Sequence, residues 1–218
     1  MGLWAPWLPF ALPQCWPFCW WVAVVIDHYS RCVMGIATFR SNPTSVSVLH
    51  FLGCAIHNAS VTPKYIICDK GQQFWCGMFK DWCDNKGITP RFGAVGQHGS
   101  IAVIERFILS LKNQCTRVIR VSLHGESFCR ELTLLAHWFN AERPHSALDG
   151  KTPQEVYHGL SPACQRPRFE PRVRWPRTAR CASPQAPVAS SCSARIRLEV
   201  RYHWGRAHLP IVALRRAA

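Results

Sequence analysis

The chain has 218 residues, enough for one good-sized domain with an extension, and a formal net charge of +14. Most of that charge lies near the C-terminus, because residues 161–218 hold 12 arginines and only two glutamates. The cysteines form no CxxC pair and lack histidine partners at zinc-ligand spacing, which argues against a zinc module or a disulfide framework, so we expect free thiols in the cytoplasm.

Residues 1–26 carry no charged side chain, which raises the question of a membrane segment. Prolines recur every three or four residues there and would interrupt a continuous membrane helix. The segment also lacks the basic start of a signal peptide. We therefore expect no membrane contact and treat residues 1–19 as an apolar lead-in rich in proline and tryptophan.

The next stretch of the chain predicts alternating strands and helices. Residues 20–27 form a β-branched apolar run typical of a strand buried on both faces, and a polar turn then leads into a second apolar run at 32–39, so the pair indicates a hairpin. Helical or strand patterns follow at 44–58 (helix), 65–69 (strand), 74–87 (helix), 101–109 (helix) and 125–140 (helix). This order predicts a mixed α/β fold.

Two carboxylates occupy positions that suit a shared metal site. Asp69 ends the apolar strand, Glu105 lies in the 101–109 helix, and thirty-five residues separate them. A carboxylate at a strand end and another on a helix can meet at the edge of a sheet and hold Mg²⁺. Lys112 follows Glu105 by about two helical turns, a suitable place for a neighbouring phosphate. The alternative is an ordinary strand-to-helix turn and a solvated helix shoulder.

The C-terminal quarter predicts a linker and a small β segment. Residues 161–195 are rich in arginine and proline and then in alanine, serine and proline, as expected of a linker. Two short apolar runs at 196–202 and 208–214 can pair as a hairpin within a segment that spans 196–218. The arginines favour a polyanion, since guanidinium groups fork onto phosphate and release counterions, although a solvated basic tail is the alternative.

Four motifs occur in a familiar order. They are DKGQQF at 69–74, the Asp-to-Glu gap, ERFILSLK at 105–112, and RPHSAL at 143–148 followed by TPQE at 152–155. Together they resemble the integrase catalytic core of bacterial insertion-sequence transposases, which is related to retroviral integrases. The resemblance covers residues 20–160 and implies a ribonuclease-H-like mixed sheet flanked by helices.

The resemblance also implies an activity. Members of this family bind two Mg²⁺ or Mn²⁺ ions on three carboxylates, hydrolyse DNA at a transposon end and join the freed 3′ hydroxyl to target DNA as multimers. Matched position by position, Asp69 is the second carboxylate and Glu105 the third. The expected DNA contacts are Lys70, Lys112, Arg143 and His145.

The first carboxylate is absent from the expected pattern. In the family it lies in a Trp-x-x-Asp-x-Thr strand, one strand before an Asp-x-x-Ser-Arg turn, and here Asp27 opens that later turn with no acid upstream. We therefore expect a truncated copy whose sheet lacks its first strand, with Asp27 as a structural strand-end acid and with impaired catalysis. The alternative function is a non-catalytic nucleic-acid-binding remnant or a regulator of an intact transposase.

Overall fold

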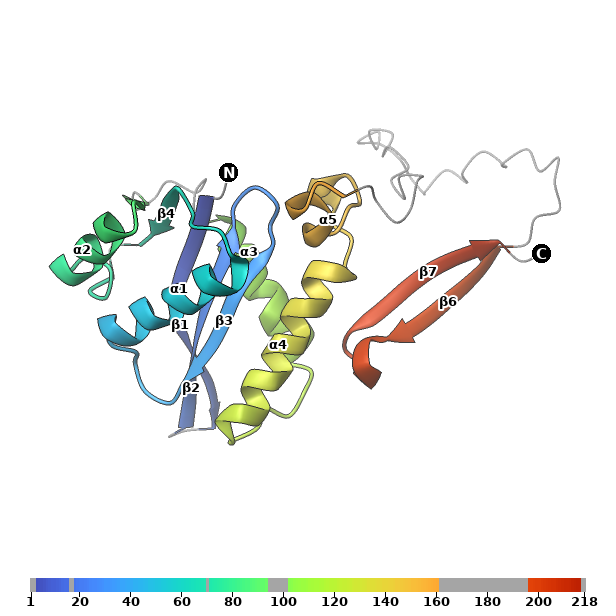
Figure 1. Cartoon of the computed structure of the whole chain (residues 1–218). Coiled ribbons are helices and arrows are strands. Elements are labelled where there is room, and N and C mark those ends of the chain that lie inside the picture. Colours follow the sequence, from blue (N-terminus) through green and yellow to red (C-terminus); the bar gives the residue numbers. More distant parts are fainter. Residues whose placement is uncertain (1–2, 16–17, 70, 94–101, 161–195, 217–218) are drawn as a thin grey trace, which may run out of the picture.

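The computed structural model describes residues 3–15, 18–69, 71–93, 102–160 and 196–216 (Figure 1). The strands are β1 Leu3–Cys15, β2 Phe18–Asp27, β3 Val33–Phe39, β4 Tyr65–Cys68, β5 Thr89–Phe92, β6 Ile196–Tyr202 and β7 Pro210–Arg216. The α-helices are α1 Ser45–Ala59, α2 Gly77–Asn85, α3 Ala102–Leu111, α4 Gly125–Ala141 and α5 Pro153–Tyr157. A π-helical turn at Lys112–Thr116 and 3-10 turns at Ser146–Leu148 and His203–Gly205 complete these elements.

The first five strands form one mixed sheet in the order β3-β2-β1-β4-β5. β1 pairs antiparallel with β2 and parallel with β4, and β4 pairs parallel with β5. The predicted mixed α/β class is confirmed. The expectation that the sheet lacks its first strand is wrong, because β1 occupies the centre of the sheet.

The prolines of β1 explain why the sequence suggested a lead-in instead of a strand. Proline cannot donate a ladder hydrogen bond and usually marks bulges or edges in sheets. The β1–β2 register shifts between Trp7 and Phe10, and again between Pro13 and Cys15, so Pro9 and Pro13 coincide with irregularities in the ladder. The strand therefore accommodates prolines that would break a helix.

The sheet carries a separate hydrophobic core on each face. Successive strand residues point to opposite faces, and accordingly Val24 packs in the core with α3 and α4 whereas Val25 packs in the core with α1 and α2. Helices α3 and α4 meet through an edge-on ring contact between Phe107 and Phe139, with centroids 4.8 Å apart.

Polar contacts fix the ends of two helices. Asn140 near the end of α4 accepts a hydrogen bond from the Val33 backbone N–H (2.8 Å) and donates one to its carbonyl (2.9 Å), which fastens α4 to β3. A capping box starts α5, since Thr152 Oγ1 accepts from Glu155 N and Glu155 Oε2 accepts from Thr152 N. These contacts place residues 143–152 against the core.

The C-terminal strands β6 and β7 form the predicted antiparallel hairpin. The hairpin contacts α4, because Leu209 is fully buried in the α3–α4 core and Trp138 Nε1 donates to the Pro210 carbonyl at 2.9 Å. An ion pair joins Arg206 to Glu131. The expected linker at 161–195 lies outside the described residues, so the proposed segment boundaries stay a prediction. Within the described part of the chain, no helix has the length and apolar character needed to cross a bilayer.

Candidate functional site

Asp69 follows the last residue of β4 at the edge of the central sheet. Its Oδ1 accepts a hydrogen bond from the Gly71 backbone N–H at 3.1 Å, which tightens the turn that leaves the strand. Ile66 and Cys68 belong to the α1–α2 core. By strand alternation the next position, Asp69, is directed to the opposite face, the one covered by α3.

Glu105 lies in the first turn of α3 and is exposed. Its neighbours Ile104, Phe107 and Ile108 are buried against the sheet, so the helix is held firmly on the α3–α4 face. Strand alternation therefore predicts Asp69 on the side of the sheet that carries Glu105. Their joint binding of a cation stays a prediction.

The strand register identifies where a third carboxylate would have to stand. Trp4 pairs with Ile66 in the parallel β1–β4 ladder. Counting three residues along each chain from that pair leads to Trp7 and Asp69. Trp7 also pairs with Val24, a residue of the α3–α4 core. Continued in this register, position 7 is predicted to come level with Asp69, and it holds tryptophan.

Sequence reasoning missed this position although a signal was present. The segment Trp4-Ala5-Pro6-Trp7 preserves the first tryptophan of the Trp-x-x-Asp pattern and replaces its aspartate. The missing acid had suggested a missing strand. The structure instead contains the strand with a different residue at the acidic position.

The donor set present matches a divalent cation only in part. Asp69 and Glu105 offer carboxylate oxygens, the ligands that Mg²⁺ prefers. Among the residues that the structure describes, no group of three or more histidine, cysteine, aspartate or glutamate side chains is gathered so as to hold a metal ion. Two carboxylates are one fewer than the expected three-carboxylate site.

Asp27 closes the turn between β2 and β3. It is 3% exposed, and its Oδ2 accepts hydrogen bonds from the Ser30 backbone N–H (2.8 Å) and hydroxyl (2.6 Å). The Asp27 backbone N–H donates to the Cys32 carbonyl at 2.8 Å. Burial, and after it the negative charge of Asp27, raises the pKa of Tyr157. The contacts of Oδ2 are those of a residue that holds a turn.

Replacing Asp27 with alanine is expected to destabilise the fold by about 2–3 kcal/mol, because two buried donors of Ser30 lose a charged acceptor. Asp27→Asn retains one acceptor and should cost less. Chemical denaturation measures both, with the exposed Asp84→Ala in α2 as the control. Equal unfolding free energies for Asp27→Ala and Asp84→Ala would contradict the structural role.

The four residues predicted to contact DNA are found in different settings. Lys70 lies outside the described residues, and Lys112 is half-buried at the start of the π-helical turn. Arg143 Nη1 donates to Gln114 Oε1 at 2.9 Å, and its guanidinium lies over the Trp138 ring. Among the described members of the predicted set, the fold brings Arg143 and His145 together.

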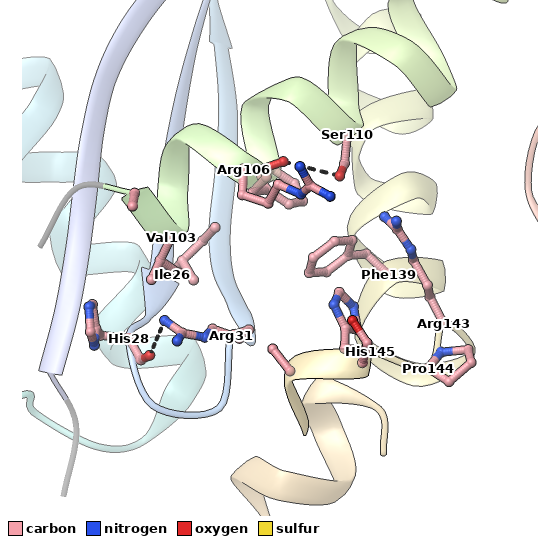
Figure 2. A pocket seen from close by; sticks show the side chains of 14 residues that line it. Ile26, His28, Arg31, Val103, Arg106, Ser110, Phe139, Arg143, Pro144 and His145 are labelled. Carbon is pink, nitrogen blue, oxygen red and sulfur yellow. Dashed lines mark hydrogen bonds between the residues drawn. The ribbon is translucent and has the colours of Figure 1, made fainter. Parts of the chain in front are cut away.

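Arg143 and His145 line a cavity of about 430 Å³, which Figure 2 shows from close by. The cavity lies between the β2–β3 turn, α3, the end of α4 and the loop that follows α4. Arg31 and Arg106 also line it, and sequence reasoning did not identify either as part of a site. Their motifs, DHYSR and ERF, are far apart in the sequence, so only the fold could unite them.

His145 gives the fold a pH dependence. Burial, followed by the charge of Arg143, lowers the pKa of His145 from its usual 6.5 to about 4. The unfolded chain therefore takes up a proton near pH 6.5, whereas the folded protein does so only near pH 4. Stability from this group is complete above the unfolded pKa and is lost as the pH falls toward the folded one.

Replacing His145 with glutamine is expected to remove a loss of stability on the order of 2 kcal/mol between pH 7 and 4. The measurement is the unfolding free energy of the wild type and of His145→Gln across that range. The exposed His158→Gln serves as the control. Parallel curves for the wild type and His145→Gln would show that His145 does not titrate in this way.

The sequence of the chain matches two family models and two curated proteins. Two family models, both described as integrase core domain, match residues 6–98 and 86–153. An uncharacterized Caenorhabditis elegans protein is 33% identical over 100 residues, and the Gag-Pol polyprotein of Rous sarcoma virus is 30% identical over 112 residues. These alignments cover 44% and 51% of the chain, but only 7% of each relative.

Solved retroviral integrases share the fold. The HTLV-2 integrase catalytic core domain in complex with magnesium (dimeric form) has a TM-score of 0.57 at 18% identity, covering 72% of this chain and 96% of that one. The BIV integrase catalytic core domain gives 0.54 at 20%, covering 72% and 94%. The simian T-cell lymphotropic virus intasome structure gives 0.62 at 15%, covering 99% and 68%. Membership of the bacterial insertion-sequence branch stays a prediction. In sequence and in fold, this chain carries an integrase core domain.

Proposed function

We propose that the chain acts on DNA as an integrase or transposase core whose metal-dependent strand transfer is impaired. The observation that carries this proposal is the register of β1. The strand is in place at the centre of the sheet, yet residues 1–26 contain no acidic side chain, and position 7, which the register predicts to be level with Asp69, is tryptophan.

The two remaining carboxylates have distinct supports. Asp69 is fixed by its hydrogen bond to Gly71, and Glu105 is carried by a helix whose opposite side is buried. A Mg²⁺ or Mn²⁺ ion on these oxygens would supply Lewis-acid activation of the attacking oxygen and stabilisation of the leaving oxygen. With one ligand fewer, we expect weaker cation binding and a poorly positioned nucleophile.

The proposed partners follow from the relatives. A neighbour of the same fold was solved with magnesium in dimeric and trimeric forms, and another is part of an intasome. We therefore propose transposon-type DNA ends and target DNA as substrates, and self-association of the chain. The chain spans only 7% of the length of each curated relative that it matches. The proposals therefore use only the integrase core and not the remaining parts of those proteins.

A second candidate is nucleic-acid binding without chemistry. Three arginines around one cavity, together with the arginine-rich C-terminal quarter, favour phosphate binding that needs no metal. A chain of this kind would regulate an intact transposase by entering mixed oligomers or by occupying its DNA. Co-purification with an intact relative would reveal that role.

The test is a joining assay on the full chain, with 3′-hydroxyl oligonucleotides and supercoiled plasmid in Mg²⁺ or Mn²⁺. We expect salt-sensitive DNA binding with joining close to background. The matched control is Asp69→Asn, which should lower any residual joining. Robust joining by the wild type that disappears in Asp69→Asn would contradict impaired catalysis. The absence of DNA binding at low salt would contradict both candidate functions.

A further inference from the structure

The cavity beside α3 is lined by a concentration of positive charge. Arg31 comes from the β2–β3 turn, Arg106 from α3, and Arg143 from the chain just after α4 (Figure 2). Two histidines, His28 and His145, lie in the same lining, which includes no aspartate or glutamate. Residues separated by more than a hundred positions thus present cations to one space.

The side chains of Arg31 and Arg143 donate to neutral partners. Arg31 Nη1 donates to the His28 carbonyl at 2.7 Å, and Arg143 Nη1 donates to Gln114 Oε1 at 2.9 Å. Within the described residues, the side-chain ion pair is Arg206–Glu131, which lies outside this cavity. A guanidinium has five N–H donors, so Arg31 and Arg143 retain donors for a further acceptor.

The positive charges around the cavity disfavour the protonated forms of their neighbours. Burial and then the charge of Arg106 lower the pKa of Arg143. Burial, followed by the charges of Arg143 and Arg31, lowers the pKa of His145. The Nε2 atom of His145 is also buried without a hydrogen-bond partner in the described structure. Buried polar atoms normally have a partner, and clustered like charges are normally offset. Both observations describe a site that suits an anionic ligand.

We propose that this cavity binds a phosphate group of a nucleic-acid strand. Arginine is suited to phosphate because its planar donors match two oxygens at once. The volume of about 430 Å³ is in the range of small-molecule sites and exceeds what one phosphate needs. Apolar side chains, including Val103, Phe107 and Phe139, line the remaining space and suit the sugar of the same nucleotide.

The cavity is separate from the two carboxylates. Adjacent residues on an α-helix are rotated by about 100°, so Glu105 lies on a different flank of α3 from Arg106. Val103, Phe107 and Ser110 share the Arg106 side and line the cavity, whereas Glu105 does not. Phosphate binding here requires no divalent cation. The choice of nucleic acid as the phosphate source rests on the proposed function, but the site itself does not.

The experiment measures binding by the full chain in EDTA, which removes any contribution from a metal site. A fluorescently labelled single-stranded oligonucleotide is titrated first, and thymidine monophosphate and inorganic phosphate are then added as competitors. We expect Arg106→Gln and Arg143→Gln each to weaken oligonucleotide binding about tenfold. They should also lower the slope of log affinity against log salt by about one. Arg130→Gln, an exposed charge on α4 outside the cavity, should change affinity less than twofold.

Arg106→Gln is the deciding variant, because Arg106 is exposed whereas Arg143 packs against Trp138. Its fold is checked by thermal unfolding. Shifts in the His145 ring resonances on addition of phosphate, lost in Arg106→Gln, would support the site. An effect of Arg106→Gln no larger than that of Arg130→Gln would overturn it. Binding of inorganic phosphate without competition against the oligonucleotide would overturn the nucleic-acid source.

Discussion

Substituting aspartate for Trp7 is expected to raise metal-dependent joining by about 100-fold, the scale on which a misplaced reacting group lowers an enzymatic rate. By extrapolation from the pairs Trp4–Ile66 and Trp7–Val24, the substitution is predicted to add a carboxylate level with Asp69 and on the face covered by α3. The joining assay measures the gain. Thermal unfolding with and without Mn²⁺ measures it independently, because a bound cation stabilises the folded state.

Trp4→Asp is the matched control for this gain. It replaces the same residue type in the same strand, but its partner Ile66 lies in the α1–α2 core on the other face. Trp4→Asp should therefore destabilise the protein without promoting joining or Mn²⁺-dependent stabilisation. If Trp7→Asp gains no more than Trp4→Asp, the register argument fails.

Phe128→Ala is expected to lower the unfolding free energy by about 3–5 kcal/mol, the usual cost of removing a buried aromatic ring. Phe128 is fully buried in α4, and its ring centroid lies 5.8 Å from that of Trp20 on β2. The cavity would weaken the packing of α4 on the sheet. Because α3 packs against α4 through Phe107 and Phe139, the same change should weaken the packing of the helix that carries Glu105.

Chemical denaturation measures this loss, and Arg130→Ala on the exposed side of α4 provides the control. We expect Arg130→Ala to stay within about 0.5 kcal/mol of the wild type. A loss below 1 kcal/mol for Phe128→Ala would mean that the α3–α4 core is not organised around this ring.

Elements defined by local patterns were predictable from the sequence. The β2–β3 hairpin follows from two apolar runs and a polar turn, and the α5 capping box from TPQE. The C-terminal hairpin followed from its two apolar runs, but its contact with α4 did not, because Leu209 and Pro210 meet α4 only in the fold. β5 was missed, since a four-residue strand containing Pro90 has little local signature.

Two parts of the candidate site were hidden for a different reason. β1 was mistaken for a lead-in because its prolines indicate a break in regular structure and because it lacks the expected acid. Its identity as a strand depends on pairing with β2 and β4, which local sequence patterns do not reveal. The cationic cavity depends on the convergence of Arg31, Arg106 and Arg143 from three segments. Periodicity along the chain carries no information about such a convergence.

Asp69 and Glu105 are proposed to bind the same cation. Calorimetric titration of Mn²⁺ into the wild type, Asp69→Asn, Glu105→Gln and the double variant tests it directly. We expect each single variant to lose most of the Mn²⁺ binding and the double variant to lose little more, because two ligands of one ion are coupled. Mn²⁺ binding that survives Glu105→Gln unchanged, or losses that simply add, would contradict it.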